Sequence, residues 1–248
     1  MHQRPVEPAT YTIRQRDTLW QIARRFHTTV AEITAENPGL DADSLRVGQI
    51  IRIPGRPGPM PQQSPPAAVG GQTQKLSEQM RLLWMEHIFW TRLAILSTAF
   101  NLPDAGAVTA RLLRNPKDFE AALKQYYGAE AAAKFADLLT DHLTIAAELV
   151  TAAKAGDTAA ATDAERRWYE NADEIAAFLG EINPYWSQRE WRKMLYDHLS
   201  LTKDEAVDIL TGNYEGSISV FENIEHQALA MADMMAGGIV KQFPQYFM

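Results

Sequence analysis

The chain has 248 residues, of which 46% are hydrophobic and 22% charged, a composition typical of folded globular proteins and long enough for two domains. Its formal net charge is −7, which argues against nucleic acid as a partner because phosphate groups require a basic protein face. It contains no cysteine, so disulfides and thiolate chemistry are excluded.

The apolar residues are dispersed along the chain rather than gathered in one long run. The first ten residues, MHQRPVEPAT, lack the apolar core of a secretory signal. No stretch approaches the roughly 18 consecutive apolar residues of a membrane-spanning helix. We therefore expect synthesis in a cytoplasm without a signal peptide, and no membrane span.

After a tail at 1–9, residues 10–54 have the pattern of a small strand–helix–helix–strand domain. Tyr11-Thr12-Ile13 alternates like a strand, and Asp17 or Thr18 can cap the helix that follows. A second short helix ends at the turn Asn37-Pro38-Gly39, and Gly48 precedes a closing strand. The first helix is expected to present Leu19, Ile22, Ala23 and Phe26 on one apolar face, and the second is expected to turn Val30, Ile33 and Ala35 inward. The closing strand is expected to comprise Leu45, Val47, Ile50, Ile51 and Ile53.

This stretch resembles the LysM module, whose usual pattern is Tyr-x-Val, Gly-Asp-Thr-Leu, Ile-Ala, an Asn-Pro turn and Gly-Gln-x-Leu-x-Ile-Pro. The matching elements in this chain are Tyr11-Thr12-Ile13, Asp17-Thr18-Leu19, Ile22-Ala23, Asn37-Pro38 and Gly48-Gln49-Ile50-Ile51-Arg52-Ile53-Pro54. One departure is Arg16, which stands where the pattern has glycine before Asp-Thr-Leu. The resemblance is specific because several spaced elements agree.

The resemblance implies binding to polymers of N-acetylglucosamine-type sugars, as in peptidoglycan or chitin. Carried over by position, the sugar groove comprises Asp17, Thr18, Leu19, Asn37, Pro38, Gly39 and Leu40. The alternative is that Asp17 and Asn37 are only a cap and a turn former, in a module kept for docking or targeting. A sugar binder without an export signal suits a bacterium that builds a spore coat around a wall layer, so we expect the protein at a spore or cell wall.

Residues 55–73 are predicted to be a linker, since five prolines lie between Pro57 and Pro66 and Gly70-Gly71 follows. From residue 74 to 248 the helical spacing of apolar residues predicts an all-α helical bundle. The expected helices span about 74–100, 106–113, 117–127, 129–155, 159–182, 187–199, 203–211 and 214–241. Thr202 is expected to cap the helix at 203–211.

Four acidic–histidine dipeptides punctuate the helical part: Glu86-His87, Asp141-His142, Asp197-His198 and Glu225-His226. The surroundings of the first three look alike, which reflects either a weak internal duplication or chance. Helical phase places His87, His142 and His198 on the apolar stripes of their helices. At the fourth pair it favours Glu225, rather than His226, as the inward residue.

Three imidazoles and a carboxylate that met at one level of the bundle would suit Fe, Mn or Zn. The predicted metal ligands are therefore His87, His142, His198 and Glu225, with Glu86, Asp141 and Asp197 as acceptors for the ring N–H groups. The alternative is a set of separate buried polar groups, each hydrogen-bonded to a neighbour. The Glu-x-x-His pairs of di-iron bundles are absent.

The sequence contains no Gly-rich phosphate loop, no Gly-x-Ser-x-Gly elbow and no His-Glu-x-x-His run. This favours a non-enzymatic protein whose LysM unit anchors a helical partner-binding or assembly domain. A metal-dependent enzyme or metal-binding protein targeted to the wall is the alternative. Met231, Met234 and Met235 either fill the core or form the surface of a homodimer.

Overall fold

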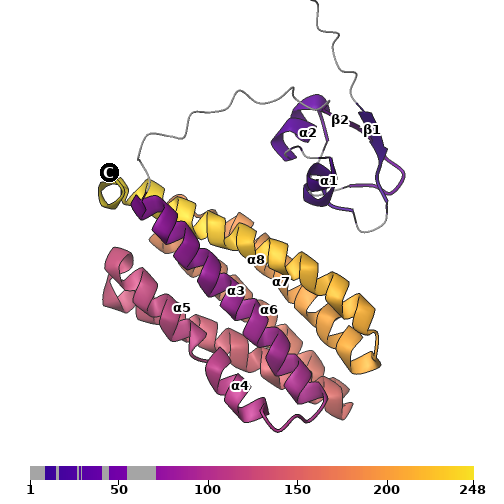
Figure 1. Cartoon of the computed structure of the whole chain (residues 1–248), viewed down its shortest axis with the longest axis vertical. Helices are drawn as coiled ribbons and strands as arrows, with labels where there is room; N and C mark the ends of the chain where they lie inside the picture. Colours follow the sequence, from indigo (N-terminus) through magenta and orange to yellow (C-terminus); the bar gives the residue numbers. More distant parts are fainter. Residues whose placement is uncertain (1–8, 15–16, 27, 29, 41–44, 55–70) are drawn as a thin grey trace, which may run out of the picture. The chain divides into compact units, whose positions relative to one another are not determined.

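The computed structural model of the chain describes residues 9–14, 17–26, 28, 30–40, 45–54 and 71–248. The chain divides into two compact units, Met1–Ala67 and Ala68–Met248 (Figure 1). The predicted tail except Ala9, the atypical Arg16 and linker residues 55–70 lie outside the described residues.

The first unit has the predicted order of two strands around two short helices. Its elements are β1 (Ala9–Thr12), α1 (Leu19–Arg25), α2 (Val30–Glu36) and β2 (Ile50–Ile53). The strands pair antiparallel, with Tyr11 opposite Ile51. Because successive strand residues point to opposite faces, Ile51 and Ile53 are buried while Ile50 is 67% exposed.

One apolar core holds this unit together. Its buried members are Tyr11, Ile13, Leu19, Ile22, Ala23, Ile33, Ile51 and Ile53. Two predictions in this unit are wrong: Ala35, predicted to face inward, is exposed, and Val47, predicted to lie in the closing strand, is outside it and 68% exposed. Val47 lies in a turn rather than in the strand, because Gly48 has a φ of 86° there and β2 begins only at Ile50.

The second unit is a helical bundle, as predicted (Figure 1). Its long helices are α3 (Gly71–Ala99), α5 (Asn115–Ala155), α6 (Thr158–Ile182), α7 (Gln188–Thr211) and α8 (Tyr214–Gln242), with the short α4 (Ala105–Leu112) and a 3-10 turn η1 (Pro244–Tyr246). The long helices pack in the cyclic order α3, α5, α6, α7, α8 and back to α3. Their inward faces therefore converge on one shared core.

Local side chains explain where these helices begin and end. The Asp157 carboxylate accepts a hydrogen bond from the backbone N–H of Ala160 at the start of α6, and the Ser187 hydroxyl accepts one from Glu190 at the start of α7. Gly156, with a φ of 74°, ends α5 in the left-handed conformation that glycine adopts without strain.

Of two predicted helix breaks, one is present and one is not. Gly128, with a φ of 79°, interrupts α5 with a kink between the expected helices at 117–127 and 129–155. The expected break before 203 is wrong: α7 runs through it, and Thr202 is buried inside that helix rather than capping one. Packing against its neighbours favours the longer helix over the local capping preference of threonine.

The core of the bundle is aromatic and methionine-rich. Met231 and Met235 are fully buried, and Met234 packs against the same core from a half-buried position. These methionines thus fill the interior, while the predicted homodimer remains a prediction. Among the described residues, no helix combines the length and apolar character that crossing a membrane requires.

Candidate functional site

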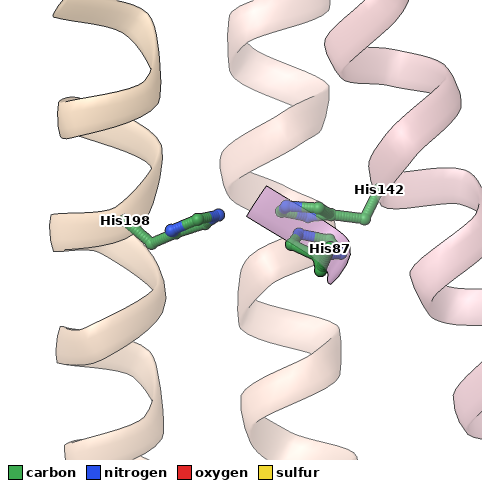
Figure 2. Close-up of side chains that lie close together, drawn as sticks. All are labelled: His87, His142 and His198. Carbon is green, nitrogen blue, oxygen red and sulfur yellow. The ribbon is translucent and has the colours of Figure 1, made fainter. Parts of the chain in front are cut away.

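Three histidines from three different helices meet inside the bundle. His87 from α3, His142 from α5 and His198 from α7 point toward one another in Figure 2. One ring nitrogen from each lies within 4.8 Å of the other two. Each side chain is only 2% exposed, so the cluster is shielded from solvent.

The outer nitrogen of each ring faces a side-chain amide. His87 Nδ1 lies 3.3 Å from Asn115 Oδ1, and His142 Nδ1 lies 3.0 Å from Asn171 Oδ1. The third pair is His198 Nδ1 with Gln227 Oε1, at 3.1 Å. Each amide therefore presents its oxygen to a histidine.

The nitrogen of each amide is also bound, and this fixes the orientation of the amide. Asn115 Nδ2 donates to the carbonyl of Leu83 at 3.0 Å, and Asn171 Nδ2 donates to that of Leu138 at 3.0 Å. Gln227 Nε2 donates in the same way to Met194 at 2.5 Å. The accepting carbonyl belongs in every case to the residue four positions before the histidine. We call this repeated arrangement the histidine–amide–carbonyl relay.

The relay determines which ring nitrogen carries the proton. An amide NH₂ can only donate and an amide oxygen can only accept, so each histidine donates from Nδ1. The network thereby assigns the lone pair of every neutral ring to Nε2. Because Nδ1 of each ring is bound to an amide, Nε2 is the nitrogen left to face the centre of the cluster. Three nitrogens that point their lone pairs at one centre have the arrangement of ligands around a cation.

The environment keeps these rings neutral. Burial lowers the pKa of His142 from its ordinary 6.5 to about 3, with a further lowering by the neighbouring His198. Burial likewise lowers the pKa of His198 to about 4 and holds that of His87 well below 6.5. Aromatic rings complete the shielding: Trp84 lies 5.7 Å from the His87 ring centre and Trp168 lies 5.4 Å from that of His142. A neutral imidazole is the form that binds a metal ion.

The fourth predicted ligand is not part of this group. Glu225 is half-buried, and it is not among the described residues whose ligand atoms converge with the three histidines. Near this position Ile224 is the fully buried residue of α8, whereas Glu225 is only half-buried. The residue of α8 that reaches His198 is Gln227, two positions after Glu225.

The acidic residues beside the histidines also differ from expectation. Glu86 pairs with Arg111 at 2.8 Å, Asp197 pairs with Lys193 at 3.0 Å, and Asp141 is exposed. The ring N–H groups bind the three amides instead. A regular spacing could have identified these amides, because each follows its histidine by 28 or 29 residues.

In the first unit, two of the predicted sugar-binding residues hold loops in place. Asp17 accepts hydrogen bonds from the Tyr11 hydroxyl at 2.8 Å and the Arg14 backbone N–H at 2.7 Å. Asn37 bonds both backbone groups of Arg52 in β2, accepting at 2.8 Å and donating at 2.7 Å. Each of these side chains therefore fixes a loop next to the sheet.

The other predicted sugar-binding residues differ in their exposure. Thr18 caps α1 through a reciprocal pair of bonds with Gln21, at 3.2 and 3.0 Å. Leu19 is buried in the core, and Leu40 packs against it from a half-buried position. Thr18, Pro38 and Gly39 are exposed, so these three are the predicted residues open to a ligand.

Comparison with known proteins identifies the first unit. Residues 11–54 match the model of the LysM domain. The chain is 38% identical over 47 residues to the secreted LysM effector ELP2 of Colletotrichum higginsianum, covering 19% of this chain and 27% of that protein. It is 45% identical over 47 residues to the probable endopeptidase p60 of Listeria seeligeri, covering 19% of this chain and 9% of that protein.

These matches cover only a small part of each relative, and no solved structure matches the chain significantly. The family match lies within the first unit, whereas residues 71–248 are mostly helical. A LysM domain implies binding of N-acetylglucosamine-containing polymers such as peptidoglycan or chitin. Residues 11–54 of this chain are a LysM domain, followed by a helical region that contains a cluster of three buried histidines.

Proposed function

We propose that the LysM domain anchors the protein on an N-acetylglucosamine polymer of a cell wall or spore layer, and that the helical unit is the part held there. The family match supports the binding half of this proposal. The fungal relative is by its name a secreted LysM effector, which is consistent with a role outside the cytoplasm. The division of the chain into two compact units supports separate tasks for them.

The sugar-binding surface that we propose is formed by the loops that precede α1 and follow α2. Asp17 and Asn37 hold these loops against the strands, while Thr18, Pro38 and Gly39 present a hydroxyl, a ring face and exposed backbone to solvent. Such groups suit the hydroxyl and acetamido groups of amino sugars, which need several weak polar contacts over an apolar face. Leu19 supports the surface from below, since it is buried.

Retention of the full chain on purified peptidoglycan and on chitin tests this surface. We expect Pro38→Glu to reduce retention because it places a charge on the exposed rim. Thr12→Glu is the matched control, because Thr12 is exposed on β1 and lies outside the proposed surface. If both variants were retained like the unchanged chain, the surface would be wrong. If the unchanged chain failed to bind either polymer, the anchoring role would be wrong.

A specific observation favours a second function, in the helical unit. We propose that His87, His142 and His198 bind one divalent transition metal through Nε2, with Zn²⁺, Fe²⁺ and Mn²⁺ as the candidate ions. The observation is the threefold histidine–amide–carbonyl relay, which holds three neutral rings with their lone pairs inward. A purely structural set of histidines requires one partner each, but not a common orientation toward one point.

The geometry is compatible with such an ion after a small contraction. Nitrogen donors about 2.0–2.1 Å from a tetrahedral Zn²⁺ lie about 3.4 Å from one another. Since the present nitrogens lie within 4.8 Å, the farthest pair would approach by at most about 1.4 Å. Three protein ligands leave a coordination position for water or another molecule, which is typical of reactive rather than structural metal sites.

Metal analysis of the dialysed full chain tests this second function. We expect one metal ion per chain after loading with Zn²⁺, and loss of that ion in His142→Ala. His226→Gln is the control, because His226 lies on α8 and is not a member of the converging group. A chain that retained no ion after loading, or a His142→Ala variant that retained the full amount, would exclude the site.

A further inference from the structure

The outer face of α3 carries apolar side chains on the surface of the helical unit. Helix α3 lies between α5 and α8 in Figure 1 and packs on its neighbours through its other faces. On the outer face Leu82 is 59% exposed, Phe89 is 50% exposed, and Phe100, directly after the helix, is 45% exposed. Half-buried apolar residues lie between them. The α3 stripe, as we name it, consists of Leu82, Met85, Phe89, Leu93 and Leu96.

The stripe occupies the side of α3 that is opposite the core. Its members are three or four residues apart, which places them on one helix face, whereas Trp84 and His87 on the other side are buried. The apolar surface continues onto α8, because the Phe100 ring lies 6.1 Å from that of the exposed Tyr214. The exposed Ile218 follows about one turn later. Contiguous exposed apolar surface of this kind marks an interaction site, unlike single scattered residues.

The spacing of the stripe fits a second copy of itself. The intervals between its members are three, four, four and three residues, so they read the same in both directions from Phe89. In an antiparallel pair of α3 helices with Phe89 at the centre, Leu82 of each copy meets Leu96 of the other. Met85 meets Leu93 in the same way. A contact in which both partners use the same patch is the kind that closes a twofold dimer.

The charges near the stripe do not oppose a second acidic copy. The segment 82–100 contains one acidic and one basic residue, Glu86 and Arg92, although the whole chain carries −7. Glu86 already pairs with Arg111 at 2.8 Å. Arg92 already pairs with the buried Glu205. Because the cores of protein interfaces are poor in charge, this neutral face suits an identical face better than a strongly charged partner.

The apolar area of the face is large enough for a reversible dimer. An aromatic side chain has about 150–250 Å² to bury, so the half-exposed Phe89, Phe100 and Tyr214 together offer about 300 Å². Leu82, Ile218 and the half-buried stripe residues bring the apolar area to about 500 Å² per copy, or about 1,000 Å² for two copies. Stable specific interfaces bury about 1,200–2,000 Å² including their polar rim, so this face lies at the lower limit of that range.

We propose that two copies of the chain associate through the outer faces of α3, antiparallel and with Phe89 on the twofold axis. Such a dimer carries two LysM domains, which strengthens attachment to a repeating polymer through multivalency. This consequence rests on the proposed anchoring, whereas the dimer itself does not.

Sedimentation equilibrium of the full chain in EDTA, at about 1 to 300 µM, tests this proposal. We expect the mass to rise with concentration from 27.8 kDa toward twice that value. Phe89→Glu is expected to raise the dissociation constant at least about tenfold, because it places two carboxylates opposite each other at the twofold axis. Tyr185→Glu is the matched control and should associate like the unchanged chain, since Tyr185 is 53% exposed but lies between α6 and α7.

Disulfide formation tests the register, and it is specific because the chain has no cysteine of its own. Helix axes about 8–10 Å apart bring facing Cα atoms within reach of a disulfide, so Phe89→Cys should form a cross-linked dimer on air oxidation. Leu82→Cys should not, because its counterpart across the interface is Leu96. The two copies of residue 82 are then about 21 Å apart at 1.5 Å per residue.

Three results would count against the proposal. A single-chain mass at every concentration would overturn it and indicate a different partner for this face. A dimer that persisted unchanged in Phe89→Glu, with folding confirmed by circular dichroism, would also overturn it, because the contact would then lie elsewhere in the chain. Equal cross-linking of Phe89→Cys and Leu82→Cys would overturn the antiparallel register.

Discussion

Acidification of the metal-free protein is expected to destabilise the helical unit through its buried histidines. The folded-state pKa is about 3 for His142 and about 4 for His198, against an ordinary value of 6.5. Below pH 6.5 the unfolded chain binds protons at these positions while the folded chain does not. The contribution of these histidines to the free energy of unfolding is therefore fully present above pH 6.5. It is lost as the pH decreases toward their folded-state pKa values.

The magnitude follows from the distance between the pH and the ordinary pKa. A solution at pH 5.0 is about 1.5 pH units below the ordinary histidine pKa of 6.5, and one unit corresponds to about 1.36 kcal/mol. Between pH 7.5 and 5.0, His142 and His198 should each lower the free energy of unfolding by about 2 kcal/mol. His87 acts in the same direction, since burial lowers its pKa as well.

Another buried group on α7 acts in the opposite direction. Burial raises the pKa of Glu205 to about 7, although its ion pair with Arg92 opposes that shift. Glu205 therefore takes up a proton in the folded state first, and acidification stabilises the fold at this position. The total pH dependence mixes both effects, so the histidine contribution must be obtained as a difference between variants.

Urea unfolding of the full chain at pH 7.5 and 5.0, in EDTA, measures that difference. Tryptophan fluorescence reports mainly the helical unit, which contains all but one of the 6 tryptophans. His142→Gln and His198→Gln should each reduce the acid-induced loss by about 2 kcal/mol, while Glu205 contributes equally in all three proteins. The reasoning would be refuted if acidification lowered the free energy of unfolding by as much in both variants as in the unchanged chain. If a variant does not fold, imidazole NMR signals that remain in the neutral position down to pH 5.0 provide the same test.

Three other substitutions have defined outcomes. Gly238→Ala should destabilise the chain by about 1–3 kcal/mol in urea unfolding, because the added Cβ would overlap the indole of Trp186, whereas Gly237→Ala, with open space at its Cβ, should stabilise it by about 0.5–1 kcal/mol. Asn171→Leu should weaken Zn²⁺ binding about 10- to 100-fold in a competition titration, because the His142 ring loses the acceptor that orients it. Thr18→Ala should lower the stability of the LysM unit by about 1 kcal/mol, measured by its own thermal transition.

Much of the fold follows from local pattern. Apart from the break wrongly predicted inside α7, the apolar spacing in 74–248 predicts helices whose observed bounds agree within a few residues, because each amphipathic stripe has only one way to face a shared core. The inward phase of His87, His142 and His198 follows from the same stripes. Their convergence on one point does not, since it depends on how far each helix slides along its neighbours.

The parts that could not be predicted depend on contacts between distant segments. Asn115 is at the start of α5 beside Pro116, where the sequence indicates a turn, yet its amide holds His87 on α3. Which residue of α8 faces His198 depends on the orientation of α8 about its own axis. An error of two positions in that assignment exchanges Glu225 for Gln227. In the LysM unit, Asp17 and Asn37 look like ligand-binding or capping residues, but only the folded sheet gives them Tyr11 and Arg52 as partners.

A crystal structure of the zinc-loaded full chain, with anomalous scattering measured at the zinc absorption edge, tests the central claim most directly. The threefold relay predicts one anomalous peak between the histidines, with Nε2 of His87, His142 and His198 about 2.0–2.1 Å from it and the three amides still bound to Nδ1. An empty space between the rings in zinc-loaded crystals, or an ion held through Nδ1, would contradict the account.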